Sequence, residues 1–112
     1  MIELFFWPTP NGMKPLIFLR ETGFEYELTP VDINQGEQFG QRFLKIAPNG
    51  RIPAIVDTVP KGGGSPVSVF ESGTILIYLA EKAGALLPDS LRARTGVLEW
   101  VMWQMAGLGP ML

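Results

Sequence analysis

The sequence predicts a single α/β domain whose strands and helices follow one another in the order β-α-β-α-β-β-α. Three observations carry this prediction. Short apolar runs at residues 2–6, 52–57 and 67–70 end at proline- or glycine-containing turns, as strands do. Segments with helical spacing of apolar residues lie between them. The chain has 112 residues, 46% of them hydrophobic, which is enough for one core.

The first strand and the first helix are separated by a rigid turn. Residues 2–6 are apolar, and the stretch Pro8-Thr9-Pro10-Asn11-Gly12 follows. The two prolines stop a β-ladder because neither has an N–H to donate. Residues 13–23 then predict a helix, with Pro15 in its first turn and Gly23 at its C-terminal cap.

The next third of the chain predicts an edge strand and a short helix. Residues 26–33 alternate between apolar and polar and include Pro30, which favours the edge of a sheet. Residues 34–38 form a polar loop around Gly36. Residues 39–46 predict a short helix that ends at Pro48-Asn49-Gly50.

Two strands and the longest helix of the first 84 residues complete the domain. Residues 52–57 and 67–70 predict strands joined by a glycine-rich loop at 58–66. A helix opens at Glu71-Ser72-Gly73 and runs through Lys82. Ser72 is expected to cap its start, and Gly84 its end.

A last helix is predicted at residues 90–106, broken by Gly107 and Gly109-Pro110. The helix carries more large apolar side chains than one 84-residue domain can cover: Leu91, Val97, Leu98, Trp100, Val101, Met102, Trp103 and Met105. Each large apolar side chain left in water forgoes roughly 1.5–3 kcal/mol of burial. We therefore expect either a dimer or a fragment, a truncated product or an engineered piece of a longer protein.

Composition excludes several classes of function. The net charge of −2 argues against nucleic acid and anionic membrane surfaces as partners. The chain has no cysteine and no histidine, so a protein thiol nucleophile, thiolate metal sites and the commonest general base are all absent. No signal-peptide pattern and no apolar run of about 18 residues is present, and we expect a cytoplasmic protein without a metal.

Three short stretches could form a site, and each has an ordinary structural alternative. The Ile52-Pro53 bond, if cis, would turn the backbone of Ile52 outward to pair with an extended peptide ligand. The alternative is a trans proline at a strand start, which is the commoner form. Glu71 could bind an ammonium and Ser72 a carboxylate at a helix N-terminus. The alternative is that both only stabilise their own helix.

The third stretch is Thr9-Pro10-Asn11-Gly12. Hydroxyl and amide donors near a helix start could stabilise a thiolate, which would have to arrive on the ligand. The alternative is that Asn11 caps the helix and Thr9 serves the turn.

The order of these stretches along the chain is more informative than any one of them. The segments TPNG (9–12), PNGRIPAIVD (48–57), FESGTILIYLAEK (70–82) and WQMAGLGPML (103–112) together resemble glutathione transferases, whose N-terminal domain has a thioredoxin-like fold. The set is most similar to the bacterial nu-class enzymes, relatives of a fungal nitrogen regulator. The resemblance covers all 112 residues.

The resemblance implies a role for each stretch. Asn11 would take the place of the usual Tyr, Ser or Cys beside the glutathione sulfur, and Thr9 would be a second donor there. Ile52 would pair through its backbone with the cysteinyl unit, with Pro53 cis. The remaining substrate-binding residues would hold the two ends of glutathione: Glu71 and Ser72 the γ-glutamyl end, and Gln38 the glycine end.

The resemblance also implies an activity and a domain organisation. Nu-class proteins are better at reducing small disulfides than at conjugating electrophiles, with glutathione as co-substrate. Residues 1–84 would be the glutathione-binding domain, and residues 85–112 a linker and the first helix of an incomplete all-helical domain. A homodimer is expected. The competing interpretation is a non-catalytic interaction module or an inactive fragment, because fold does not bring activity. A redox protein with its own cysteine pair is excluded.

Overall fold

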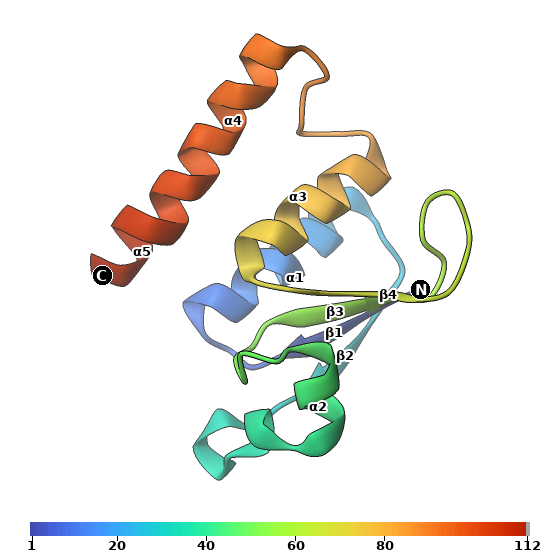
Figure 1. Ribbon diagram of the computed structural model, residues 1–112, viewed down its shortest axis with the longest axis vertical. Helices are drawn as coiled ribbons and strands as arrows, with labels where there is room; N and C mark the ends of the chain where they lie inside the picture. Colours follow the sequence, from blue (N-terminus) through green and yellow to red (C-terminus); the bar gives the residue numbers. More distant parts are fainter. Residues whose placement is uncertain (112) are drawn as a thin grey trace.

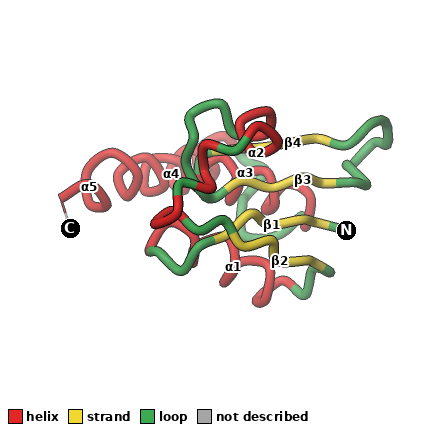
Figure 2. The backbone as a smooth tube through the Cα atoms, turned by 90° about the horizontal axis from the view of Figure 1, so that it is seen from below, coloured by secondary structure: helices red, strands yellow, loops and turns green. Residues whose placement is uncertain are grey.

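A four-stranded sheet forms the centre of the protein in the computed structural model, which describes residues 1–111. The strands are β1 (Ile2–Phe6), β2 (Tyr26–Pro30), β3 (Ala54–Asp57) and β4 (Val67–Phe70), in the spatial order β2-β1-β3-β4 (Figure 2). β1 pairs with β2 in parallel and with β3 antiparallel, and β3 pairs antiparallel with β4. The presence of four strands and the edge position of β2 are confirmed, but β2 ends at Pro30 and not at residue 33 as predicted.

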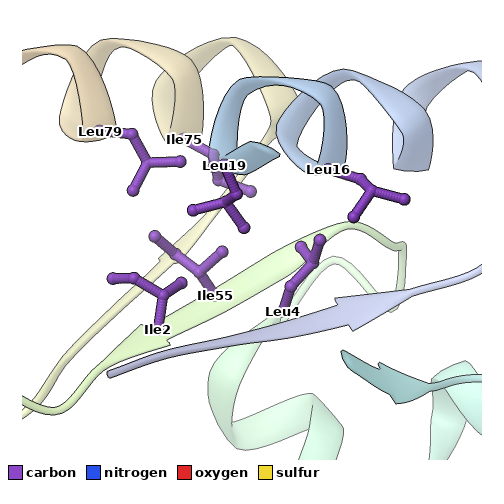
Figure 3. Close-up of a cluster of buried hydrophobic side chains, with 7 residues drawn as sticks. All are labelled: Ile2, Leu4, Leu16, Leu19, Ile55, Ile75 and Leu79. Carbon is purple, nitrogen blue, oxygen red and sulfur yellow. The ribbon is translucent and has the colours of Figure 1, made fainter. Parts of the chain in front are cut away.

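Helices cover both faces of the sheet (Figure 1). α1 (Pro10–Thr22) and α3 (Ser72–Ala83) pack side by side on one face, and α2 (Gln41–Ile46) lies on the other. Side chains alternate along β1, so Leu4 faces the first layer and Phe5 the second. The main core lies under α1 and α3 and consists of Ile2, Leu4, Leu16, Leu19, Ile55, Ile75 and Leu79 (Figure 3).

Helix α1 begins three residues earlier than predicted. Thr9 is its N-cap, since Thr9 Oγ1 accepts a hydrogen bond from the Gly12 N–H at 3.1 Å. Pro10 takes the first helical position, where its missing N–H costs nothing. Pro15 therefore lies inside the helix and not in its first turn. The predicted position of Pro15 in the first turn was wrong, and so was the alternative that Asn11 caps this helix.

Two other local predictions need correction. The N-cap of α3 is Glu71, whose φ is 72°, and Ser72 is the first helical residue. The segment predicted as a polar loop contains two short 3₁₀ turns, Ile33–Gln35 and Glu37–Phe39. The side chain of Asp32 caps the first of these turns by accepting from the Asn34 N–H at 2.9 Å. Local capping thus orders a stretch whose composition is typical of a loop.

The last helix continues through the residues expected to break it. α4 (Leu91–Trp103) is followed by a π-helical turn (Gln104–Leu108) and by the short α5 (Gly109–Met111). The Gly109 N–H donates to the Gln104 carbonyl, five residues earlier. This wider turn shifts the hydrogen-bond register just before Pro110, which has no N–H to donate. Leu112, at the end of the predicted 85–112 segment, lies outside the described residues.

α4 carries several large apolar side chains that are exposed, as the sequence predicted. Leu91 is 84% exposed, Trp100 67% and Trp103 51%. The two tryptophan rings contact each other edge to face, with centroids 5.2 Å apart. Within residues 1–111, no helix combines the length and the apolar character that a membrane crossing requires.

A buried acid fixes the C-terminal half of α3 to the end of β3. Asp57 is fully buried, and its Oδ2 lies 2.9 Å from Lys82 Nζ and 2.8 Å from the Tyr78 hydroxyl. Its Oδ1 accepts from the Val59 N–H at 3.0 Å. Burial alone would raise the pKa of Asp57, but these hydrogen bonds and the Lys82 charge lower it overall. Burial and Asp57 raise the pKa of Tyr78 to about 12, so its hydroxyl stays a donor.

Candidate ligand-binding site

The strand register brings the three candidate stretches to one end of the sheet, where β1 and β4 finish and β3 begins. Phe5, near the end of β1, pairs with Ala54 at the start of β3, and Ala54 pairs with Phe70 at the end of β4. The turn into α1, the Ile52-Pro53 bond and the start of α3 each adjoin one of these three residues. Segments more than 60 residues apart in the chain therefore meet, and the N-termini of α1 and α3 open at the same place.

Two adjoining hollows lie at this end of the sheet, and every site residue predicted from the sequence lines at least one of them. A larger hollow at the other end of α3, about 830 Å³, is lined by none of the predicted residues. The first site hollow, about 240 Å³, is lined by Thr9, Asn11, Ile33, Gln38, Gly50, Arg51 and Ile52. The second, about 60 Å³, is lined by Asn11, Asn49, Arg51, Ile52, Pro53, Glu71, Ser72 and Met105.

In the turn before α1, Thr9 caps the helix and Asn11 lines the hollows. The Thr9 hydroxyl accepts the capping bond from Gly12 and meets the Trp7 carbonyl at 3.5 Å, the limit of a hydrogen bond. Asn11 is exposed in the first turn of α1 and lines both hollows. Gly12 is required by close approach, since a Cβ there would lie 2.2 Å from the Trp7 carbonyl oxygen. Because Thr9 provides the cap, the Asn11 side chain is not required for it.

Gln38 presents a buried acceptor to the first hollow. Its Nε2 donates to the Ile33 carbonyl at 3.4 Å, while its Oε1 is buried and has no hydrogen-bond partner among residues 1–111. A buried acceptor without a partner costs about 1–3 kcal/mol. A ligand N–H in this hollow would remove that cost.

Ile52 lies where the two hollows join, one residue before a cis bond. The Ile52-Pro53 peptide is cis, so the trans alternative was wrong and the implication of the resemblance is confirmed for this bond. Ile52 precedes β3, which begins at Ala54 and not at residue 52 as predicted. Ile52 therefore lies outside the ladder and lines both hollows.

Glu71 and Ser72 form the far wall of the second hollow. Glu71 is exposed, and its Oε1 accepts from Asn49 Nδ2 at 3.4 Å. Ser72 is 3% exposed, and its hydroxyl donates to Met105 Sδ at 3.3 Å. No side chain within residues 1–111 caps the start of α3. A carboxylate thus stands beside helix N–H groups and a hydroxyl, a pairing that suits a ligand bearing both an ammonium and a carboxylate.

The structure adds residues that the sequence analysis did not select. Asn49 and Arg51 belong to the PNGRIPAIVD stretch and could have been chosen from it. Met105 comes from the helical turn after α4, so only the packing of that segment against α3 places it in the site. No group of three or more acidic, cysteine or histidine side chains within residues 1–111 is arranged to hold a metal ion.

Comparisons with known proteins show the family to which this chain is related. Residues 1–81 match the family described as glutathione S-transferase, N-terminal domain. The chain is 54% identical over 112 residues to the disulfide-bond oxidoreductase YfcG of Escherichia coli (strain K12), covering 100% of this chain and 52% of that protein.

Two solved structures share the fold at high similarity. A glutathione transferase family member from Pseudomonas fluorescens pf-5, solved with two glutathione bound, superposes with a TM-score of 0.93 at 46% identity, covering 98% of this chain and 48% of that one. A glutathione transferase from Pseudomonas putida, with one glutathione disulfide bound per subunit, gives 0.92 at 44% identity, covering 98% and 47%. The chain therefore spans about half the length of these relatives, and it belongs to the glutathione S-transferase family, whose N-terminal, thioredoxin-like domain it contains.

Proposed function

We propose that this protein is a glutathione-dependent enzyme that reduces small disulfides, with weak conjugation or peroxide reduction as secondary activities. One observation carries the proposal. All seven residues expected to hold glutathione, from four separate segments of the chain, line two hollows that join at Asn11 and Ile52. The similarity to a disulfide-bond oxidoreductase supports the choice of reaction, and the proposed class is the bacterial nu class.

The order of the hollows matches the order of units in glutathione. The γ-glutamyl unit, with its ammonium and carboxylate, fits Glu71 and Ser72 in the second hollow. The cysteinyl unit would pair with the backbone of Ile52 at the junction, which places its sulfur near Asn11 and Thr9. The glycine end would extend into the first hollow toward Gln38, whose free Oε1 can accept an N–H.

The chemistry then belongs to the bound thiol, because the chain has no cysteine. The glutathione thiolate attacks one sulfur of a disulfide, forms a mixed disulfide and releases the other sulfur as a thiolate. A second glutathione attacks the mixed disulfide at the glutathione sulfur, which yields glutathione disulfide and releases the second product thiol. Two glutathiones are oxidised and one disulfide is reduced, and the rate rises with the thiolate fraction of the bound thiol. Asn11 would raise that fraction by donating to the thiolate.

We further propose the domain organisation and assembly expected from the resemblance. Residues 1–84 form the glutathione-binding unit, and residues 85–112 form a linker and the first helix of an all-helical domain, in a cytoplasmic homodimer. The exposed apolar side chains of α4 support this proposal, because Trp100 and Leu91 are the kind of side chain that an adjoining helix or subunit covers. Light scattering on the 112-residue chain measures its mass directly, and a monomer would contradict the dimer.

Calorimetric titration with reduced and with oxidised glutathione tests the function. We expect the chain to bind both, and we expect Glu71→Gln to weaken binding about tenfold through loss of the charge that pairs with the ligand ammonium, without changing the melting temperature. Glu27→Gln on the exposed edge strand β2 is the matched control and should bind as the parent does. A folded chain that binds neither form would favour a non-catalytic interaction module.

A further inference from the structure

We propose that Lys14 is a further ligand-binding residue, whose ammonium pairs with the α-carboxylate of the γ-glutamyl unit that Ser72 also binds. The inference rests on the proposed function, because it names a partner for one end of glutathione. It adds to that function a cation from α1 and a segment after α4 that holds this cation in place.

Two hydrogen-bond donors from different helices converge on one sulfur atom. Lys14 Nζ, from α1, lies 3.5 Å from Met105 Sδ, and Ser72 Oγ, from the start of α3, lies 3.3 Å from the same atom. Met105 lines the second hollow together with Ser72 and Glu71. The Lys14 ammonium therefore stands at the edge of the hollow assigned to the γ-glutamyl unit, close enough for one carboxylate to reach both donors.

A thioether is a weak partner for these donors, and a carboxylate is a strong one. Methionine sulfur is only a weak acceptor, whereas hydrogen bonds from an ammonium to a carboxylate are charge-assisted and roughly twice as strong as neutral ones. The methionine side chain has three rotatable bonds and can yield its position at low cost. Exchange of Met105 Sδ for a carboxylate oxygen would therefore improve the hydrogen bonding of both Lys14 and Ser72.

The charges around the hollow also favour a cation beside Ser72. Glu71 and Arg51 line the hollow with one charge of each sign, while Ser72 and the N–H groups of α3 carry no full charge. Burial lowers the pKa of Lys14, although the Glu71 charge raises it in part, so this ammonium is incompletely solvated. Lys14 is the cation that shares a contact with Ser72, through Met105, and with Glu71 it offers opposite charges to a zwitterionic head group.

The π-helical turn after α4 fixes the position of Lys14. Its first residue, Gln104, accepts a hydrogen bond from Lys14 Nζ at 2.7 Å through Oε1. Its second residue, Met105, packs so closely on α3 that a Cβ at Gly73 would lie 2.9 Å from Met105 Cγ. Turns of this kind often occur at functional sites. The segment thus holds the ammonium toward the start of α3.

The test is a calorimetric comparison of two ligands on Lys14→Met and on the parent chain. The ligands are reduced glutathione and 4-aminobutanoyl-cysteinylglycine, which keeps the ammonium but lacks the α-carboxylate. We expect Lys14→Met to weaken glutathione binding about tenfold and to change binding of the analogue by less than about twofold. Lys14→Arg should keep most of the affinity for glutathione. Lys61→Met, in the loop before β4, is the matched control and should bind both ligands as the parent does.

Each result decides one claim. Equal binding of glutathione by Lys14→Met and the parent would overturn the role of Lys14, and so would equal weakening of both ligands, which marks a structural effect. Lys14→Gln, a neutral and polar variant, serves the same comparison if the methionine variant does not fold. Failure of the parent chain to bind glutathione at all would instead contradict the proposed function, so the two failures are distinguishable.

Discussion

The two helices that start at the site begin in opposite ways. The start of α1 is completed by the chain itself, with Thr9 as a side-chain cap and Pro10 in the first helical position. The start of α3 has no side-chain cap within residues 1–111, and its N-cap, Glu71, adopts a φ of 72°. A non-glycine residue with this backbone is strained and needs a compensating reason. The comparison shows that the first N–H groups of α1 are met by the chain's own cap, whereas those of α3 have no side-chain cap among the described residues, as the proposed binding of a ligand there requires.

A helix with an open start must be held elsewhere, and α3 is held near its other end. Lys82 and Tyr78 bind the buried carboxylate of Asp57, and Gly84 closes the helix with a φ of 65° and a hydrogen bond to the Ala80 carbonyl. These contacts are far along the helix from Ser72. The residues that bind Asp57 are thus distinct from the residues proposed to bind the ligand.

The largest change in the free energy of unfolding is expected at the C-terminal end of α3, where Asp57 binds. Asp57→Asn should lower the free energy of unfolding by about 3 kcal/mol, because removing one partner of a buried pair leaves Lys82 without its counter-charge. Urea unfolding measures the loss, and Glu25→Gln on the surface is the control. Binding of glutathione per folded molecule should stay unchanged. Weaker binding by the folded variant would show that the two ends of α3 are not independent.

The same pair predicts how stability depends on pH. The pKa of Asp57 is lowered in the folded state, so its contribution is fully present above the unfolded value of about 4 and is lost as pH falls through the lower folded value. The difference in unfolding free energy between the parent and Asp57→Asn should therefore be constant from pH 7 to about pH 5 and shrink in more acidic solution. A difference that grows toward acid would contradict this assignment.

Removing the cap of α1 should have the next largest effect. Thr9→Ala should cost about 1 kcal/mol of stability, since the Gly12 N–H loses its side-chain acceptor. Thr9→Ser keeps the hydroxyl and should restore most of the loss. Equal stability of the alanine variant and the parent, measured by urea unfolding, would remove the contrast between the two helix starts.

Relieving the strain at α3 should stabilise the protein and weaken the site. Glu71→Gly permits the positive φ, and we expect a gain of about 0.5–1 kcal/mol after the entropy of glycine in the unfolded chain is counted. Affinity for glutathione should fall as it does in Glu71→Gln. A glycine variant that is less stable than the glutamine variant would show that the backbone at residue 71 is not strained.

The smallest effect on stability is expected at Asn11. Asn11→Ala should change the unfolding free energy by no more than about 0.5 kcal/mol, because Asn11 is exposed and Thr9 provides the cap. The pKa of bound glutathione should rise, since its thiolate loses an amide donor. Ultraviolet absorbance of the thiolate against pH measures this change. An unaltered pKa would leave Asn11 without a role at the sulfur.

Sequence reasoning predicted the sheet better than the ends of its helices. The apolar runs of β1 and β3 and the proline of β2 determined strand identity and edge position without tertiary information. Helix ends depended on competing local choices. Proline at residue 10 or at residue 15 can open a helix, and the contact between Thr9 and Gly12 decides between them. At Gly107 and Pro110, packing of the chain end and a change of hydrogen-bond register outweigh the low helix propensity of these residues.

For the site, the family resemblance supplied most of the residues, and packing supplied the rest. Thr9, Asn11, Ile52 and Glu71 lie in the motifs that carry the resemblance, and all four line the hollows. Lys14 lies in α1 and Met105 near the end of the chain, 91 residues later in the sequence, and no local pattern links them. Their meeting depends on how the segment after α4 packs against α3.

The edge-to-face pair of Trp100 and Trp103 gives the protein an optical signal of its own. Both indoles are exposed on α4, while the remaining tryptophan, Trp7, stands just before the turn into α1. Any partner that covers these two tryptophans should shift their fluorescence emission to shorter wavelength and alter their near-ultraviolet circular dichroism. Assembly can therefore be followed spectroscopically, without an added label.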